Sequence, residues 1–361
     1  MAPNAFPWHE RIRAKRDRTL ALGMGLYQRY ARLFWAAHSA WALFTGGVVL
    51  VLAHNRYGFL PWVVLFLTLT WASTLFFSRF AVGRDSARLR FAHGFVSYLT
   101  RVMYQETLFF LLPFYFYSTT FPSWNSGYVV LLAALAVLSC FDMIFDRLLR
   151  NTRPFAVGFF AVVTYSALQF FVPLVFHVQI HNGAYIAAVL AFAAALPVAY
   201  SWQELRQGRR LALIALALAL VIGVLKVGRA LMPPVPLRLS SMSFATGINP
   251  VTLQLDHELG RAVPAAELGQ GRLVVRATIF SPGRLPVRLR LRFLHDGRIL
   301  RTSRTLGLVA HRRGFRIWEA IRSGPEGFAP GLYRVEVWTG EGQLVGRGEI
   351  RVTGKSVREA P

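Results

Sequence analysis

Seven long apolar runs constrain the fold of this chain more than any other feature of its sequence. A run of about 18 or more apolar residues is typical of a helix that crosses a membrane. The runs extend from Leu33 to Ala53, Gly58 to Ser78, Met103 to Thr120, Gly127 to Leu148, Phe155 to His177, Ala184 to Trp202 and Leu211 to Met232. We therefore predict a bundle of seven transmembrane helices. Because the first run follows 32 residues and is longer than a signal-peptide core, we expect it to be retained.

The basic residues give these helices a direction. The first 32 residues, the end of the fourth run at Arg147, and the connections after the second, fourth and sixth runs contain 18 basic residues, whereas the alternate connections contain only Arg56. Positive residues collect on the cytoplasmic side of membrane proteins. The pattern predicts a cytoplasmic N-terminus and, after seven crossings, an external C-terminal region. Since the abundance of Arg, Ala, Leu, Gly and Pro is typical of a G+C-rich bacterial genome, we expect a multi-pass protein of the bacterial cytoplasmic (inner) membrane with a periplasmic C-terminal domain.

One stretch before the third run allows two interpretations. Between Leu89 and Met103, apolar residues recur at helical spacing, while Arg88, His93 and Arg101 fall on the other side. This pattern is typical of an amphipathic helix that lies on the inner leaflet. The alternative is a third transmembrane helix that begins early.

The composition changes after the last run. A stiff connection rich in proline occupies residues 233–237, and residues 238–361 contain short alternating segments. The clearest predicted strands are Leu273–Ile279, Val287–Leu294, Ile299–Leu306, Phe315–Ile321, Leu332–Trp338 and Gln343–Val352. Asp296-Gly297 and Gly340-Glu341-Gly342 are typical of hairpin turns. We predict an antiparallel, immunoglobulin-like β-sandwich of about eight strands. Its predicted core contains Leu273, Val275, Ile279, Leu289, Leu291, Tyr333, Val335, Val337 and Ile350.

The stretch LPVRLRLRFLHDGR, residues 285–298, places three arginines on one face of a predicted strand. Alternation turns Val287, Leu289, Leu291 and Phe293 towards the core and leaves Arg288, Arg290 and Arg292 facing solvent. In a soluble protein such a face would favour nucleic-acid binding, but the predicted topology places it outside the cytoplasmic membrane. Two interpretations remain. The arginines form a solvated face that pairs with Glu336, Glu341 or Glu349 on neighbouring strands, or they attract anionic lipid headgroups or an anionic envelope polymer.

Two parts of the chain resemble families of unknown function. Residues 105–127, QETLFFLLPFYFYSTTFPSWNSG, resemble the membrane part of domain of unknown function 5924. The stretch from Val274 to Val352, with ATIFSPGRL, RGFRIW and GLYRVEVWTGEGQLVGRGEIRV, resembles domain of unknown function 2914. It departs from that family at residues 290–293, which read Arg-Leu-Arg-Phe where the family has a His-x-Trp pattern. The resemblances imply a membrane protein with a β-sandwich domain, and they imply no activity.

Three carboxylates inside the predicted helices mark a candidate intramembrane cluster. Glu106 lies one turn into the third run, and Asp142 and Asp146 lie near the inner end of the fourth. At one depth near the cytoplasmic interface, they could hold a divalent cation or carry a proton. The alternative is a structural ion-pair network, because Asp146 and Arg150 are four residues apart on a helix. The full candidate set is Gln105, Glu106, Asp142, Asp146, Arg147 and Arg150.

Three smaller features complete the list of candidates. The outer loop Trp124-Asn125-Ser126 is typical of an interfacial aromatic anchor followed by a turn. His177 and His181 lie at helical spacing but offer only two ligands, so we predict no metal site. We expect no cofactor. The single cysteine, Cys140, lies within an apolar run and is predicted to be a small buried apolar residue.

These features favour a non-enzymatic anchor that presents a sandwich for binding. The predicted partners are membrane lipids and an envelope protein or anionic polymer, without nucleic acid. The alternative is a membrane-embedded enzyme or transporter that uses Glu106, Asp142 and Asp146. The predicted organisation is a basic cytoplasmic segment (1–32), a seven-helix domain (33–232), a linker (233–237) and an external sandwich domain (238–361).

Overall fold

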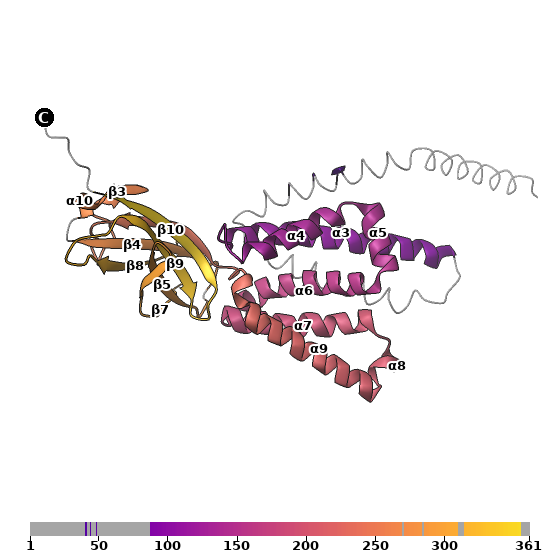
Figure 1. The fold of residues 1–361 in the computed structure, drawn as a ribbon. Helices are drawn as coiled ribbons and strands as arrows, with labels where there is room; N and C mark the ends of the chain where they lie inside the picture. Colours follow the sequence, from indigo (N-terminus) through magenta and orange to yellow (C-terminus); the bar gives the residue numbers. More distant parts are fainter. Residues whose placement is uncertain are drawn as a thin grey trace, which may run out of the picture.

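The computed structural model describes residues 40, 41, 44, 48, 87–268, 271–283, 285–309 and 314–354, with side chains described from Val102 onwards except at 142, 143, 146 and 150. Helices occupy the first part of this range and two β-sheets the second (Figure 1). The first two predicted spans, 33–53 and 58–78, lie outside the described residues apart from the four isolated positions. The count of seven therefore stays a prediction.

The third predicted span is part of a much longer helix. Helix α3 (Ala87–Tyr117) begins sixteen residues before Met103, so the amphipathic stretch and the apolar run form one helix, as the second interpretation expected. Its C-terminal half packs inward through Leu108, Leu111 and Tyr115, which are at most 1% exposed. α3 is not among the helices that are apolar enough to cross a membrane. The reason is that its apolar part contains Gln105, Glu106 and several tyrosines.

The prediction of a single helix from Gly127 to Leu148 is wrong. The structure has two helices here, α4 (Ser126–Ser139) and α5 (Asp142–Asn151), separated at Phe141, whose φ of −92° and ψ of 75° are not helical. With 14 residues, α4 is about 21 Å long, shorter than the roughly 30 Å hydrocarbon layer. The break falls where the sequence changes from uniformly apolar to amphipathic. An amphipathic helix is most stable along the membrane surface, whereas an apolar helix is most stable across the membrane, so the two need not be collinear.

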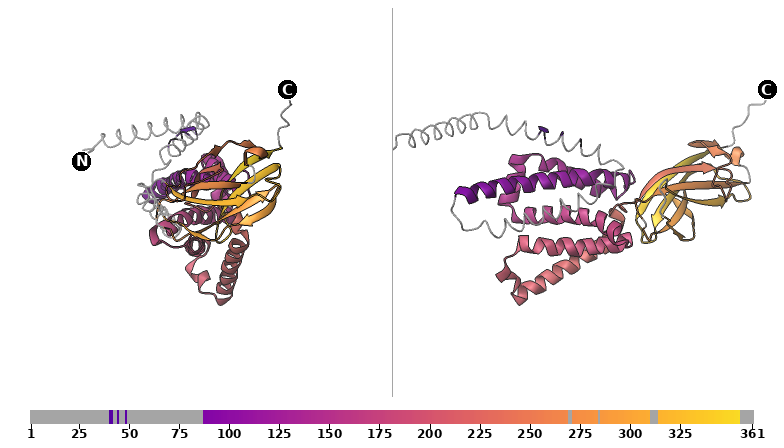
Figure 2. Two further views of the ribbon diagram at one scale, coloured as in Figure 1. Left: turned by 90° about the vertical axis from the view of Figure 1, so that its left-hand side faces the viewer. Right: turned by 180° about the vertical axis from the view of Figure 1, so that it is seen from behind.

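Three of the described helices are long and apolar enough to cross a membrane. They are α6 (Arg153–Phe176), α7 (Ile180–Ala199) and the continuous stretch formed by α9 (Gly208–Val227) and the 3₁₀ turn η2 (Gly228–Leu231). These match the fifth, sixth and seventh predicted spans. α6 and α7 pack closely, because a Cβ at Gly183 would lie 2.6 Å from Cγ of Pro173. α9 has no buried residue and diverges from α7 towards the short helix α8 (Trp202–Leu205) (Figures 1 and 2).

The β-rich part, residues 238–354, contains two sheets. Its elements are β1 (Arg238–Ala245), β2 (Glu258–Leu259), β3 (Ala262–Pro264), α10 (Ala265–Leu268), β4 (Arg272–Phe280), β5 (Arg288–His295), β6 (Arg298–Thr302), β7 (Leu306–Gly307), β8 (Phe315–Arg322), β9 (Gly331–Thr339) and β10 (Leu344–Thr353). One sheet has the order β2-β1-β4-β8, and the other has the order β3-β10-β9-β5-β6, with β7 also paired to β5. Inward-facing residues of both sheets form one core, so the two sheets pack as a sandwich. We call this part the sandwich.

The alternation of the strands is confirmed in the core. All nine residues predicted for it are buried, and Leu289, Leu291 and Phe293 on β5 are at most 1% exposed. Asp296 and Gly297 have φ values of 45° and 83°, as a two-residue turn between β5 and β6 requires. Two expectations are corrected. The predicted strand Ile299–Leu306 is interrupted at residues 303–305, and β3 pairs with β10 in parallel, because the long chain between them allows a parallel return.

The sandwich lies at one end of the helices, as Figure 1 and the right view of Figure 2 show. The loop between α3 and α4, the turn between α6 and α7, and the end of α9 all lie at this end. The connection between α5 and α6, and α8, lie at the opposite end. Neighbouring helices therefore alternate in direction along the bundle.

Candidate functional site

The predicted intramembrane cluster is placed on two helices. Gln105 and Glu106 lie in the interior of α3, where Gln105 is buried and Glu106 is half-buried. Asp142, Asp146, Arg147 and Arg150 lie on α5, and Arg147 is exposed. Because the side chains of Asp142, Asp146 and Arg150 are outside the described part, a shared site with Glu106 stays a prediction.

A polar group inside the bundle was missed by the sequence analysis. The hydroxyl of Tyr115 on α3 donates to the backbone oxygen of Ser166 at 2.9 Å and lies 3.0 Å from Oε1 of Gln169, both on α6. The hydroxyl of Tyr128 on α4 lies 2.7 Å from Oγ of Ser166. Tyr115, Ser166 and Gln169 are fully buried. These bonds join three helices, which is the ordinary structural role of polar side chains between membrane helices.

The predicted outer loop is a junction between the helices and the sandwich. Trp124 is 82% exposed, as expected of an anchor, but Asn125 is 1% exposed. The Asn125 Oδ1 accepts hydrogen bonds from the backbone N–H of Thr120 at 3.4 Å and from the Ser123 hydroxyl. Its Nδ2 donates to the backbone oxygen of Leu344, at 3.2 Å, in β10. Asn125 thus fixes its own loop and holds the sandwich.

Further polar contacts extend this junction to α7 and the end of α9. Nε2 of Gln343, a residue 3% exposed, donates to the backbone oxygen of Met232 at 3.2 Å. Arg229 donates to the backbone oxygen of Glu341 at 3.3 Å, and the Glu341 carboxylate lies 3.6 Å from Nδ1 of His181. Arg347 donates to the backbone oxygen of Pro122. The β9–β10 hairpin is therefore hydrogen-bonded to the loop between α3 and α4 and to the end of α9, and it lies beside the first turn of α7.

The two predicted histidines do not share a helix. His177 has a left-handed backbone (φ 52°) and ends α6, whereas His181 lies in the first turn of α7. Spacing of four residues places side chains together only within one continuous helix. Over the residues that the structure describes, no three His, Cys, Asp or Glu side chains are grouped as a metal ion would require.

The predicted arginine face lies on the outer side of β5. Arg288 and Arg290 are exposed and Arg292 is half-buried, with its guanidinium 4.8 Å from the ring centre of Trp338 on β9. Nε of Arg290 donates to Oγ1 of Thr305 at 3.0 Å. Arg290, Arg292 and Trp338 line a small pocket of about 90 Å³. This volume has room for a few water molecules or one small anion.

The expected acidic partners of this face are engaged elsewhere. Glu349 accepts a hydrogen bond from Nε of Arg334 at 2.7 Å, and Glu336 accepts one from Nε1 of Trp338 at 2.8 Å, although Glu336 lies opposite Arg292 in the sheet register. Glu341 faces His181. Within the described part of the chain, the three arginines have no ion-pair partner among these glutamates, so their charge remains available to an anion.

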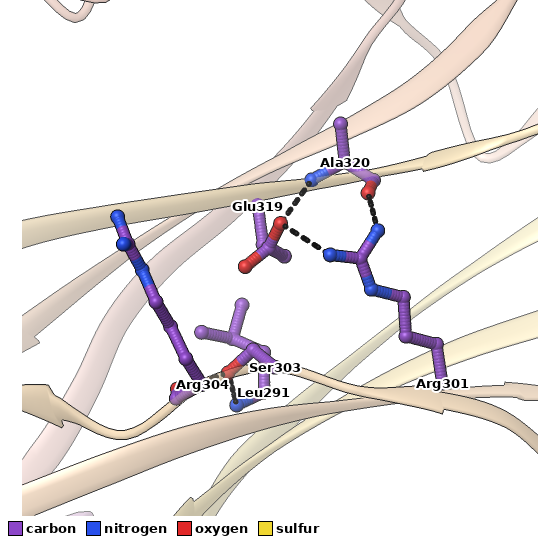
Figure 3. Close-up of polar contacts among 6 residues, drawn as sticks. All are labelled: Leu291, Arg301, Ser303, Arg304, Glu319 and Ala320. Atoms are coloured by element: carbon purple, nitrogen blue, oxygen red, sulfur yellow. Dashed lines mark hydrogen bonds and ion pairs between the residues drawn. The ribbon is translucent and has the colours of Figure 1, made fainter.

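A larger pocket opens between the edges of the two sheets and was not predicted. It has a volume of about 530 Å³ and is lined from β6, β7, β8 and the loop at Leu253. Figure 3 shows Arg301 reaching from β6 to Glu319 and Ala320 on β8, with Arg304 extending in the same direction. Arg301 donates to the backbone oxygen of Ala320 at 3.1 Å and to Oε1 of Glu319 at 3.4 Å. No sequence pattern signals this pocket, because its walls come from strands of different sheets.

Comparison with known families decides where the chain belongs. Residues 14–273 match DUF5924, a family of unknown function. The chain is a member of this family. The match covers more than the predicted membrane part, since it continues through β1, β2 and β3 into β4. It ends one residue before the stretch that resembles domain of unknown function 2914, so that second resemblance stays a prediction. A comparison with curated proteins gives no match, and the DUF5924 membership carries no activity with it.

Proposed function

We propose that this DUF5924 member is an integral membrane protein that holds its sandwich at the outer surface of the cytoplasmic membrane of a bacterium, where the sandwich binds an anionic component of the envelope. The arrangement of the basic residues supports this orientation. Arg147 and Arg150 lie on α5 and Arg153 begins α6, where the two helices meet, and the segment around α8 contains Arg206, Arg209 and Arg210. Both lie at the end opposite the sandwich. Positive residues favour the cytoplasmic side.

The observation that carries the binding function is the arginine excess of the sandwich. Residues 238–354 contain 18 arginines and nine acidic residues. Several of those acidic residues are already in ion pairs, as Glu319 and Glu349 show. The face of β5 concentrates this excess on a rigid strand with an aromatic ring, Trp338, packed beside Arg292. A rigid cationic face attracts anionic lipids or polymers without needing a catalytic group.

Cysteine labelling tests the orientation. The single cysteine, Cys140, is fully buried, so Cys140→Ala provides a background without thiols. Trp124→Cys, at the sandwich end, should react with a membrane-impermeant maleimide in intact cells whose outer barrier has been opened. Trp202→Cys, in α8, should react only after the cytoplasmic membrane is broken; both native side chains are well exposed, at 82% and 65%. Labelling of the two positions in the reverse order would overturn the orientation.

A charge-matched comparison tests the binding face. The full chain in an uncharged detergent is passed over immobilised dextran sulfate, with neutral dextran as the blank. Arg288→Gln, Arg290→Gln and Arg292→Gln together should lower the salt concentration needed for elution. The control is the triple variant Arg272→Gln, Arg322→Gln and Arg351→Gln, which removes the same charge from exposed positions elsewhere. If both variants lowered the eluting salt concentration equally, the loss of net charge alone would explain the result, and the assignment to β5 would be overturned.

A further inference from the structure

We propose that the pocket between β6–β7 and β8 binds a phosphate-bearing amphiphile, with the phosphate against its arginines and an apolar portion against its inner wall. The inference relies on the proposed function only for the position of the sandwich at a membrane surface. It concerns a different site from the face of β5. We refer to it below as the edge pocket.

Two charged residues of the edge pocket, Arg301 and Glu319, lie on the core-facing side of their strands. Arg301 lies opposite Phe293 in the β5–β6 register, and Phe293 is buried. Glu319 lies on the same face of β8 as Ile317 and Ile321, which are buried. Inward-facing charge on an edge strand is one way to prevent edge-to-edge aggregation. The Arg301–Glu319 pair alone would meet that need, yet the pocket contains two more arginines.

The edge pocket has a surplus of positive charge. Arg301, Arg304 and Arg316 line it together with a single acidic residue, Glu319. Arg304 and Arg316 have no ion-pair partner among the residues that the structure describes. Guanidinium groups form paired, charge-assisted hydrogen bonds with phosphate oxygens. A lining with three arginines and one carboxylate therefore favours an anion with several oxygens.

The remaining wall of the edge pocket is apolar. Leu253, Leu306, Phe315 and Ile317 contribute to the lining. A simple inorganic anion would not use this wall, whereas an acyl or similar apolar segment would gain free energy by covering it. A volume of about 530 Å³ lies within the usual range for small-molecule sites.

Two residues of the apolar wall, Leu306 and Phe315, lie towards the membrane end of the sandwich. Leu306 pairs with Leu289, next to Arg288, whose backbone oxygen accepts from Gly340 in the hairpin that contacts the helices. Phe315 pairs with Ile279, close to the loop in which Gly283 approaches Leu174 of α6. Arg301 and Glu319 lie further along their strands. Arg316 lies between Phe315 and Ile317, at the level of the apolar wall. A lipid entering from the outer leaflet would thus place its chain near the membrane and its phosphate towards Arg301 and Arg304.

Titration calorimetry on the full chain in an uncharged maltoside detergent tests the proposal. The probes are dihexanoyl-phosphatidylglycerol below its micelle concentration, dihexanoyl-phosphatidylcholine and glycerol phosphate. We expect one site that prefers the phosphatidylglycerol. Glycerol phosphate separates a free phosphate from a lipid source: binding as tight as that of the phosphatidylglycerol would assign the site to soluble phosphates and overturn the amphiphile. Equal affinity for the two lipids, or no binding of any probe, would overturn the site itself.

Variants assign the binding to the edge pocket. Arg304→Gln and Arg316→Gln should each weaken phosphatidylglycerol binding by about tenfold or more, the loss typical of one charge-assisted contact. Arg322→Gln, an exposed residue of β8 outside the lining, is the matched control and should change nothing. Leu306→Ala should weaken the lipid and leave glycerol phosphate unchanged.

Glu319→Gln gives a test of opposite sign. Removing the only carboxylate of the lining should strengthen anion binding. If Glu319 served only to prevent pairing at the sheet edge, its removal would change only the melting temperature, which is measured in parallel. Unchanged affinity in the variants of Arg304, Arg316 and Glu319 would overturn the proposal. The β5 triple variant should keep full lipid affinity, so a failure of the edge pocket and a failure of the β5 face are distinguishable.

Discussion

Nδ2 of Asn125, the residue that precedes α4, donates a hydrogen bond to the backbone oxygen of Leu344, the first residue of β10, over 3.2 Å. The two residues are 219 positions apart in the chain. Both the Asn125 side chain and Leu344 are buried. This bond therefore links the helical part directly to the sandwich. Together with the other hydrogen bonds of the junction, it fixes the position of the sandwich relative to the helices.

We expect Asn125→Ala to destabilise the full chain by about 1–3 kcal/mol, because it removes three hydrogen bonds of a buried side chain, including the one to the backbone oxygen of Leu344. The measurement is thermal unfolding in detergent, followed by tryptophan fluorescence. Asn151→Ala, an exposed asparagine at the end of α5, is the matched control and should unfold like the wild type. A melting temperature for Asn125→Ala equal to that of Asn151→Ala would contradict the role assigned to the bond.

The sandwich core provides a pair of identical substitutions at contrasting positions. Leu291 is fully buried and Leu300 is 51% exposed, on adjacent strands β5 and β6. Leu291→Ala should cost about 2–5 kcal/mol, because it removes buried apolar surface and leaves a cavity. Leu300→Ala should change the unfolding free energy by about 0.5 kcal/mol or less. Equal losses in chemical unfolding would show that the strand register is wrong.

Glycine substitutions test the close packing of α6 and α7. A Cβ at Gly183 would lie 2.6 Å from Cγ of Pro173, whereas a Cβ at Gly158 on α6 would meet nothing within 4 Å. Gly183→Ala should destabilise the protein by about 1–3 kcal/mol through overpacking. Gly158→Ala should be neutral or slightly stabilising, since alanine favours the helix. The measurement is the melting temperature of both variants. A Gly183→Ala variant as stable as the wild type would contradict the close contact between α6 and α7.

The capping box of α8 predicts a pH dependence. The Glu204 carboxylate accepts from the backbone N–H of Ser201 at 2.8 Å and from its hydroxyl, and these bonds, together with Arg210 and Arg153 nearby, lower the pKa of Glu204 below 4.5. A lowered folded-state pKa means that the stabilisation is present above the unfolded pKa and is lost as the pH falls through the folded one.

Glu204→Ala should therefore lower the melting temperature at neutral pH, and the difference from the wild type should vanish in acid. Glu326→Ala, at an exposed turn of the sandwich, controls for loss of one negative charge. A difference that persisted unchanged at acid pH would contradict the cap.

The sandwich was accessible from sequence because its signals are local. Alternation along residues 287–293 fixed which side chains face the core, and the Asp296-Gly297 turn fixed the β5–β6 pairing. The interruption at Ser303 was missed, since its hydroxyl accepts from the backbone N–H of Leu291 in place of a regular strand bond. This hydrogen bond joins residues that are twelve positions apart, and the periodicity of a single segment does not reveal such a contact.

The helical part was harder to predict from the sequence, because hydropathy reports how apolar a segment is and not where one helix ends and the next begins. It joined α4 to α5 across Phe141, because Met143, Ile144 and Phe145 resume the apolar pattern after Asp142. It began α3 too late, because Arg101 interrupts the apolar pattern without ending the helix. The roles of Asn125 and the edge pocket were out of reach for another reason. Both depend on segments that meet only after the sandwich has docked and its sheets have paired.

The close pairing of α6 and α7 has a consequence for biogenesis. Their connection, residues 177–179, is short, and at the other end Arg153 donates to the backbone oxygen of Ala199, so the two helices are tied at both ends. A hairpin closed in this way can leave the insertion machinery as one unit, with most of its backbone polar groups already paired. In the proposed membrane topology, it would be in the bilayer while α9 and the sandwich were still being synthesised. The sandwich would thus be synthesised after part of the helical bundle had already assembled.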